Sequence, residues 1–171
     1  MITGINIFKN QIHKDNRGHF REIYKKKTLK SKELIFDCMS ASKKNVIRGL
    51  HIQVQSPQAK FLTVIKGKIF DVAVDLRKNS KTFGKYFSIE LSVNNYSSIY
   101  IPEGFAHGFY TLDKENIIFY SCSNYRSKDN EVGILWNDKS ININWPTENP
   151  VISKKDNKNI SFKEYCKKYI T

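Results

Sequence analysis

Residues 64–77 read Val-Ile-Lys-Gly-Lys-Ile-Phe-Asp-Val-Ala-Val-Asp-Leu-Arg, and no other stretch indicates β-structure as strongly. Two β-branched runs flank the short step Lys66-Gly67, which predicts a tight hairpin in which Gly67 supplies the positive φ. From Phe70 onward, apolar and polar residues alternate with a period of two. One face of this strand is therefore expected to be core, and the other polar or lining a site.

Similar runs of Ile, Val, Phe and Tyr recur about every eight to twelve residues, the spacing of an antiparallel sandwich or barrel. The expected strands are residues 4–8, 19–24, 34–39, 46–53, 61–65, 68–75, 86–92, 97–101, 108–112 and 117–123. Only residues 161–170 have a helical pattern, with Ser161 as N-cap and Glu164 at the capping-box position, and residues 146–159 are expected to be loop. The sequence predicts one all-β domain over residues 1–171, a jelly roll with a short C-terminal helix.

The chain is strongly basic, with 29 Lys and Arg against 16 Asp and Glu and a formal net charge of +13. Nearly all of this charge is lysine, whereas proteins that read base sequence favour arginine for its bidentate fork. No recognition-helix, zinc-finger or RNA-recognition signature is present either. The sequence therefore predicts a solvated lysine surface and no nucleic-acid partner.

The cellular location follows from apolar runs and cysteines. The longest apolar stretches have the length of strands, and residues 1–10 lack the pattern of a signal peptide, so no membrane partner is expected. Cys38, Cys122 and Cys166 are an odd set without C-x-x-C spacing, which predicts reduced thiols. We expect a cytoplasmic protein.

Two of the four histidines stand in informative surroundings. Residues 102–107 form a P-x-G-x-x-H pattern that resembles the second motif of the cupin superfamily, where a turn aims a histidine, here His107, into the barrel. Metal-binding cupins carry H-x-H in their first motif, but here Gln53 stands where the second ligand would follow His51. Because three protein ligands cannot be assembled, no metal and no other cofactor is expected.

Arg48 precedes His51 by three residues, with Gly49 between them where a ligand could approach the backbone. An anion clamp beside a base indicates a phosphorylated substrate. On residue types alone, Arg48 could equally form a structural salt bridge, and a lone strand histidine is more often a core or surface residue than a catalyst.

Several longer motifs follow one another in a recognisable order. They are residues 46–51 (VIRGLH), 70–77 (FDVAVDLR), 82–85 (TFGK), 100–109 (YIPEGFAHGF), 133–138 (GILWND) and 145–146 (WP). Over about residues 15–156 the chain resembles the dTDP-4-dehydrorhamnose 3,5-epimerases. The resemblance implies a metal-free cupin jelly roll, usually a homodimer whose N-terminal strands cross to the partner. It also implies inversion at C3, C5 or both of a nucleotide-linked 4-keto sugar.

Such a reaction needs two opposed groups, because a proton removed beside the C4 ketone must be replaced on the opposite face. By the resemblance, His51 is the general base, and Asp156 in the segment Ser153-Lys154-Lys155-Asp156 orients it as the aspartate of a hydrolase triad does. Tyr120 matches the opposing acid. Lys60 matches a cation that stabilises the enolate.

The remaining matches concern the ketone and the nucleotide. His107 is expected to support the ketone and Arg48 to hold the diphosphate. Arg17 and Glu22 match a family segment, D-x-R-G-F-F-x-E, that helps to bind the nucleotide, often that of the partner subunit. His19 in this segment, Gln53 and Arg126 complete the set of expected substrate contacts.

His19 stands where the family usually has an aromatic residue, and Arg126 where the thymidine enzymes commonly have a second tyrosine. Arginine reads guanine O6 and N7 well, so two substrates stay open: a dTDP-4-keto-6-deoxyhexose or a GDP-4-keto-heptose. Neutral substitutions at the rim of the site would explain both departures equally well.

The resemblance predicts a cofactor-independent nucleoside-diphosphate-4-keto-sugar 3,5-epimerase that serves the synthesis of capsule or lipopolysaccharide sugars. A sugar 3,4-ketoisomerase is an alternative, but its relatives carry a second histidine where this chain has Gln53. A non-catalytic sugar-nucleotide-binding cupin would keep Arg48 and Arg17 without needing Tyr120 and Asp156.

Overall fold

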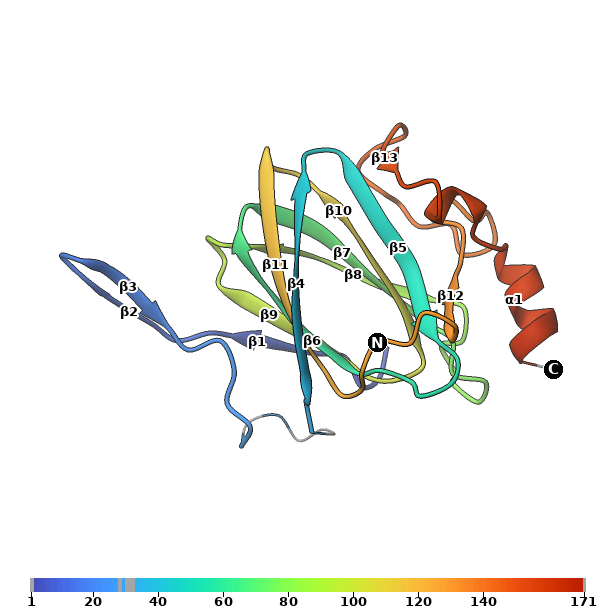
Figure 1. Ribbon diagram of the computed structural model, residues 1–171, viewed down its shortest axis with the longest axis horizontal. Coiled ribbons are helices and arrows are strands. Elements are labelled where there is room, and N and C mark those ends of the chain that lie inside the picture. Colours follow the sequence, from blue (N-terminus) through green and yellow to red (C-terminus); the bar gives the residue numbers. More distant parts are fainter. Residues whose placement is uncertain (1, 28, 30–32, 171) are drawn as a thin grey trace.

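Two mainly antiparallel sheets packed face to face form the body of the protein (Figure 1). The computed structural model describes residues 2–27, 29 and 33–170. The first sheet has the order β1 (Asn6–Lys9), β9 (Ser97–Ile101), β6 (Lys60–Lys66), β11 (Glu115–Cys122) and β4 (Phe36–Lys43). The second has the order β12 (Glu131–Gly133), β5 (Val46–Gln53), β10 (Phe105–Thr111), β7 (Lys68–Asp75) and β8 (Tyr86–Ser92), and β13 (Val151–Ile152) pairs with β5. The predicted all-β class is confirmed.

The hairpin predicted at Gly67 is wrong. Strand β6 pairs with β9 and β11 in the first sheet, whereas β7 pairs with β8 and β10 in the second. Gly67 has a φ of 82° and turns the chain from one sheet to the other. Turn chemistry is the same for a hairpin and for this corner, so only the packing of the two strands distinguishes them.

The two faces of strand β7 belong to two different hydrophobic cores. Ile69 and Ala73 point between the sheets, into the core that includes Leu62 and Ile118. The expected apolar face, which includes Val72, points outward instead and is covered by the C-terminal segment. That outer core contains Val72, Val74, Leu76, Ile134, Ile141, Trp145 and Tyr165. Each such side chain contributes about 1.5–3 kcal/mol on full burial, so the C-terminal segment is firmly attached to the second sheet.

The C-terminal segment is more ordered than the sequence predicted. Residues 146–159 were expected to be loop, but they contain β13, which runs parallel to β5, and the short 3-10 helix η1 (Asp156–Lys158). Both elements are too short to leave a periodic pattern. The predicted helix is confirmed as α1 (Phe162–Tyr169), with the capping box between Ser161 and Glu164.

The N-terminal residues form an arm. Strands β2 (Ile12–Asp15) and β3 (Gly18–Arg21) pair only with each other and project from the body on the side opposite α1 (Figure 1). Phe20 on this arm is 65% exposed. The strand expected at residues 19–24 ends at Arg21, and the sequence did not predict β2 or β12. Within the described part of the chain, no helix is long and apolar enough to cross a membrane.

Replacing Gly67 tests the corner between the sheets. A Cβ atom at this position would lie 2.3 Å from the carbonyl oxygen of Glu115, and the positive φ adds backbone strain. Gly67→Ala should lower the free energy of unfolding by about 2–4 kcal/mol, measured by urea denaturation. Gly18→Ala is the control, because Gly18 also has a positive φ but a Cβ there meets no atom within 4 Å. Equal losses in the two variants would contradict the proposed clash.

Candidate active site

A cavity of about 540 Å³ lies between the sheets and is closed on one side by the C-terminal segment. The inward side chains of β4, β6 and β11 form one wall, and those of β5 and β10 form the other. The cavity brings together these residues singled out in the sequence: Arg48, His51, Lys60, His107, Tyr120, Arg126 and Asp156.

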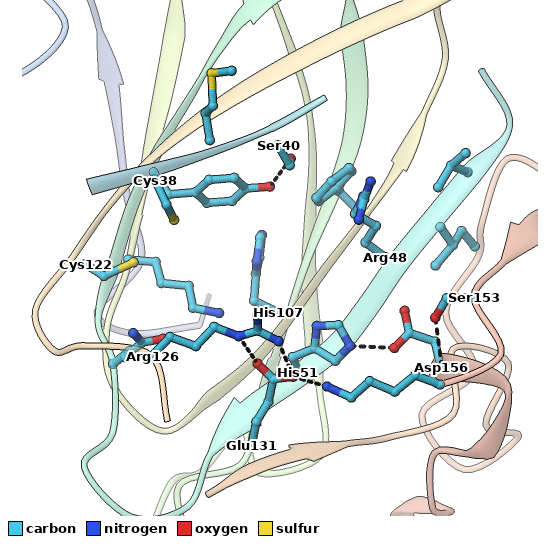
Figure 2. A pocket seen from close by; sticks show the side chains of 18 of the residues that line it. Cys38, Ser40, Arg48, His51, His107, Cys122, Arg126, Glu131, Ser153 and Asp156 are labelled. Carbon is cyan, nitrogen blue, oxygen red and sulfur yellow. Dashed lines mark hydrogen bonds and ion pairs between the residues drawn. The ribbon is translucent and has the colours of Figure 1, made fainter. Parts of the chain in front are cut away.

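His51 and Asp156 form a hydrogen-bonded pair, drawn as a dashed line in Figure 2. The imidazole Nε2 on β5 lies 2.7 Å from Oδ1 of Asp156 in η1. The backbone N–H of Asp156 donates to Ser153 Oγ at 3.0 Å, and its Oδ2 accepts from the backbone N–H of Gly49 at 3.4 Å. Burial opposes ionisation of Asp156, but its hydrogen bond with His51 and the charge of that ring hold the pKa of the carboxyl below its usual value. The ionised carboxylate therefore orients the ring and stabilises its protonated form.

Tyr120 and Lys60 lie across the cavity from His51, on strands of the other sheet. The Tyr120 hydroxyl is 3.1 Å from Ser40 Oγ, and burial raises the pKa of this phenol well above its usual value. The phenol therefore keeps its proton until a strong base is formed beside it. Burial lowers the pKa of Lys60, and the nearby Cys122 and Glu131 partly offset this effect.

A second histidine–carboxylate pair lies beside the first. His107 on β10 is directly opposite His51 in the strand register, and its Nε2 lies 2.8 Å from Oδ2 of Asp71 on β7. Both partners are buried, and the other Asp71 oxygen has no hydrogen bond among the described residues. The sequence reasoning missed Asp71, although its place on the polar face of the alternating strand was a usable signal.

Cationic groups line the mouth of the cavity. Arg48 is exposed and donates to Ser42 Oγ at 2.9 Å. Arg126 Nε donates to Glu131 Oε2 at 3.0 Å, and Lys155 pairs with the same carboxylate. Burial would raise the pKa of Glu131, but hydrogen bonds from Arg126 and Lys155 lower it to about 2. Glu131 and Lys155, which the sequence reasoning missed, tie the loop that carries Asp156 to β12.

The structure uses Gln53 differently from the expectation. Its side chain does not line this cavity. Its Nε2 donates to the carbonyl oxygen of Ser56 at 2.8 Å, and its Oε1 accepts from the backbone N–H of Ser127 at 2.7 Å. A glutamine amide can bridge two loops in this way because it carries both donors and an acceptor.

Three expected nucleotide contacts lie on the arm or at its base, outside the cavity of their own chain. Arg17 is 86% exposed and pairs with Asp15 at 2.7 Å. His19 is exposed on β3, and Glu22 pairs with Lys25. Nothing in the chain's own fold brings these three side chains to His51.

No group of three or more His, Cys, Asp or Glu side chains converges as a metal site within residues 2–27, 29 and 33–170. His51 and His107 each bond to a carboxylate instead. The arrangement suits acid–base chemistry between two opposed walls.

Comparison with known proteins identifies the family. The model of a family described as dTDP-4-dehydrorhamnose 3,5-epimerase matches residues 1–164. The chain belongs to this family. The enzyme of that name from Shigella flexneri is 45% identical over 161 residues, covering 91% of this chain and 89% of the relative. The enzyme from Methanothermobacter thermautotrophicus is 41% identical, covering 91% and 88%.

Solved structures agree with this assignment. The epimerase from Bacillus anthracis with TDP and PPi bound has a TM-score of 0.90 and 38% identity, covering 94% of this chain and 95% of that one. The epimerase from Legionella pneumophila in complex with dTDP-4-keto-L-rhamnose has a TM-score of 0.89 and 37% identity, covering 92% and 87%. The predicted cupin-type fold, family and epimerase class are confirmed. The protein is an isomerase that epimerises nucleotide-linked 4-keto sugars.

The ion pairs of Glu131 with Arg126 and Lys155, here called the Glu131 clasp, should affect how the free energy of unfolding depends on pH. The pKa of Glu131 is about 2 in the folded chain against an ordinary value of 4.5, so its stabilising effect is present above pH 4.5 and lost as pH falls toward 2. Glu131→Gln should remove about 3 kcal/mol of the pH-dependent loss, measured by denaturant unfolding at several pH values. Glu148→Gln, at an exposed position, is the control and should leave the slope unchanged. An unaltered slope in Glu131→Gln would contradict the role given to the clasp.

Proposed function

We propose that this epimerase acts on a dTDP-4-keto-6-deoxyhexose and inverts C3 and C5 by proton removal at His51 and proton return from Tyr120. The observation that carries the proposal is the pair of His51 and Asp156 on one wall of the cavity, with Tyr120 and Lys60 on the other. Two proton carriers on opposite faces of a bound sugar are what inversion of a carbon beside a ketone requires.

The hydrogen bond to Asp156 determines which nitrogen of His51 reacts. Since Nε2 donates to the ionised carboxylate, Nδ1 carries the lone pair that accepts the substrate proton. The C–H bond breaks, its electrons move to the C4 oxygen as an enolate, and the imidazolium is stabilised by Asp156. The Tyr120 phenol then gives its proton to the opposite face of the carbon.

The enolate needs a positive partner, and Lys60 supplies it. In its protonated form the ammonium stabilises the developing charge at the C4 oxygen, a contribution of about 3–4 kcal/mol for one well-placed donor. His107, held by Asp71, supports the same region of the sugar from the neighbouring strand. No cofactor takes part in this scheme.

The charged residues of the cavity and the names of the relatives both support a dTDP-linked substrate. Arg48 lines the cavity and is exposed, so its guanidinium can bind the diphosphate. Arg126 is already held by Glu131, an arrangement that leaves its fork less free to read a guanine edge. The relatives described above are named as enzymes of dTDP sugars or contain TDP, which favours dTDP over the GDP-4-keto-heptose alternative.

We further propose a homodimer in which the arm reaches the partner's cavity. The arm projects from the body, exposes Phe20, and carries Arg17 away from its own cavity. We also propose that the enzyme is cytoplasmic, since Cys38, Cys122 and Cys166 form no disulfide. Its product would then serve the synthesis of capsule or lipopolysaccharide sugars.

Solvent exchange tests the base directly. On incubation with a dTDP-4-keto-6-deoxyhexose in D₂O, the wild type should incorporate deuterium at C3 and C5, whereas His51→Asn should lose at least about 10³-fold in exchange rate because no base remains. Tyr120→Phe should retain exchange but lose most net inversion. Mass spectrometry and NMR measure both quantities.

Nucleotide binding by the His51→Asn variant is the control for the exchange experiment. Titration of His51→Asn with dTDP and GDP should show a dissociation constant for dTDP close to that of the wild type and at least about tenfold lower than that for GDP. Undiminished exchange in His51→Asn would exclude His51 as the base. A preference for GDP would instead support the heptose substrate.

Mixing two impaired variants, assayed at a substrate concentration far below the KM of Arg17→Ala, tests the shared site. Arg17→Ala should raise the KM for the nucleotide sugar, since it removes a cation that the partner's site needs. When the Arg17→Ala and His51→Asn chains are unfolded and refolded together, half of the dimers are mixed and each mixed dimer has one complete site. About one quarter of wild-type activity should return. Activity no higher than the sum of the separate variants would contradict an arm that acts in the partner's cavity.

A further inference from the structure

Two thiols that the mechanism does not use stand in the wall of the substrate cavity. Cys38 on β4 and Cys122 on β11 both line it, on the side away from Asp156 (Figure 2). Cys38 is opposite Tyr120 in the strand register, so Cys122, two residues further along β11, is its diagonal neighbour on the same face of the sheet.

The two thiols differ in exposure and in hydrogen bonding. Cys38 is exposed, whereas Cys122 is buried. The interaction between the two thiols is the main reason that the pKa of Cys38 falls to about 7, and it raises the pKa of Cys122. Lys60 and Arg126 favour the Cys38 thiolate, while burial and Asp37 oppose it. An accessible sulfur beside cations and an S–H donor has the surroundings of a reactive cysteine.

We propose that Cys38 is a thiol-modification site at which a small anionic disulfide forms a mixed disulfide, occupies the substrate cavity and stops epimerisation. The Cys38 thiolate attacks one sulfur of the reagent, the reagent's S–S bond breaks, and its other half leaves as a thiolate. An added thiol reverses the reaction by the same exchange.

The position of Cys38 explains both the choice of reagent and the effect. Arg48, Arg126 and Lys60 line the same cavity and attract an anion, as they would the diphosphate of the substrate. Cys38 and Tyr120 are directly opposite each other on β4 and β11. An adduct on Cys38 would therefore lie beside Tyr120, where the sugar would bind. Binding of substrate and modification of Cys38 are therefore mutually exclusive.

A mixed disulfide is favoured over a bond between Cys38 and Cys122. Diagonal positions of an antiparallel pair have Cα atoms about 7–8 Å apart, whereas disulfides need about 4.4–6.8 Å. Cys122 therefore favours the Cys38 thiolate as a neighbour and is not the second sulfur of a disulfide. Cys166 on α1 is an internal control, since burial raises its pKa and it lies outside the cavity.

The test treats the full chain with 5,5′-dithiobis(2-nitrobenzoate), a dianionic disulfide, and follows the released thionitrobenzoate. Peptide mass spectrometry locates the adduct, and deuterium exchange of the sugar measures activity. Cys38 should react at least about tenfold faster than Cys166, saturating dTDP should slow its reaction at least about fivefold, and the cationic disulfide cystamine should react more slowly. Exchange activity should fall in proportion to the labelled Cys38 and return with dithiothreitol.

Variants separate the contributions of the three thiols. Cys38→Ser should abolish the fast release of thionitrobenzoate, whereas Cys166→Ser should keep it. Cys122→Ala should slow this release, because the neighbouring thiol that favours the Cys38 thiolate is lost. First labelling at Cys166 or Cys122, or labelling of Cys38 that leaves exchange unchanged, would overturn the proposal. The site and the relative rate of labelling in the wild type do not depend on the variants, on the nucleotide or on the sugar, so first labelling at another cysteine is distinguishable from a failure of the proposed reaction.

Discussion

The hydrogen bond between His51 and Asp156 depends on the attachment of the C-terminal segment to the second sheet. The two residues are 105 positions apart, and they meet because β13 pairs with β5 and residues after Gly133 cover its outer face. Burial of Trp145 and Tyr165 therefore stabilises the active site as well as the fold. A change that loosened this outer core would separate His51 from Asp156 without touching either residue.

Burial separates the roles of two similar pairs. His51 with Asp156 and His107 with Asp71 have nearly the same geometry and lie on neighbouring strands. The side chain of His51 is 25% exposed and that of His107 only 5%. A ring with an accessible nitrogen can exchange protons with a substrate, whereas a buried ring mainly presents a fixed dipole. Asp71 and Glu131 also favour the charged form of Lys60, which burial in the cavity opposes.

Several errors of the sequence reasoning concern contacts that only the folded chain decides. The step at Gly67 was compatible with a hairpin, and only the burial of the two faces of β7 sends β6 and β7 into different sheets. Gln53 was expected at the substrate because it follows His51 by two residues, but bonds to Ser56 and Ser127 hold it in a loop contact. Asp71 and Glu131 were missed because each gains its importance from a partner elsewhere in the fold: His107 on β10 for Asp71, and Arg126 and Lys155 in loops for Glu131.

Part of the secondary structure could be predicted from the sequence alone. The period-two alternation after Phe70 and the capping box at Ser161 depend on neighbouring residues, and they predicted strand β7 and helix α1. The order of the motifs along the chain predicted the family. The meeting of Asp156 with His51, the diagonal placement of Cys38 and Cys122, and the direction of the arm required the folded molecule. Such contacts form only when particular faces are buried together, and the free energy of that burial belongs to the whole sandwich, with no short segment carrying it alone.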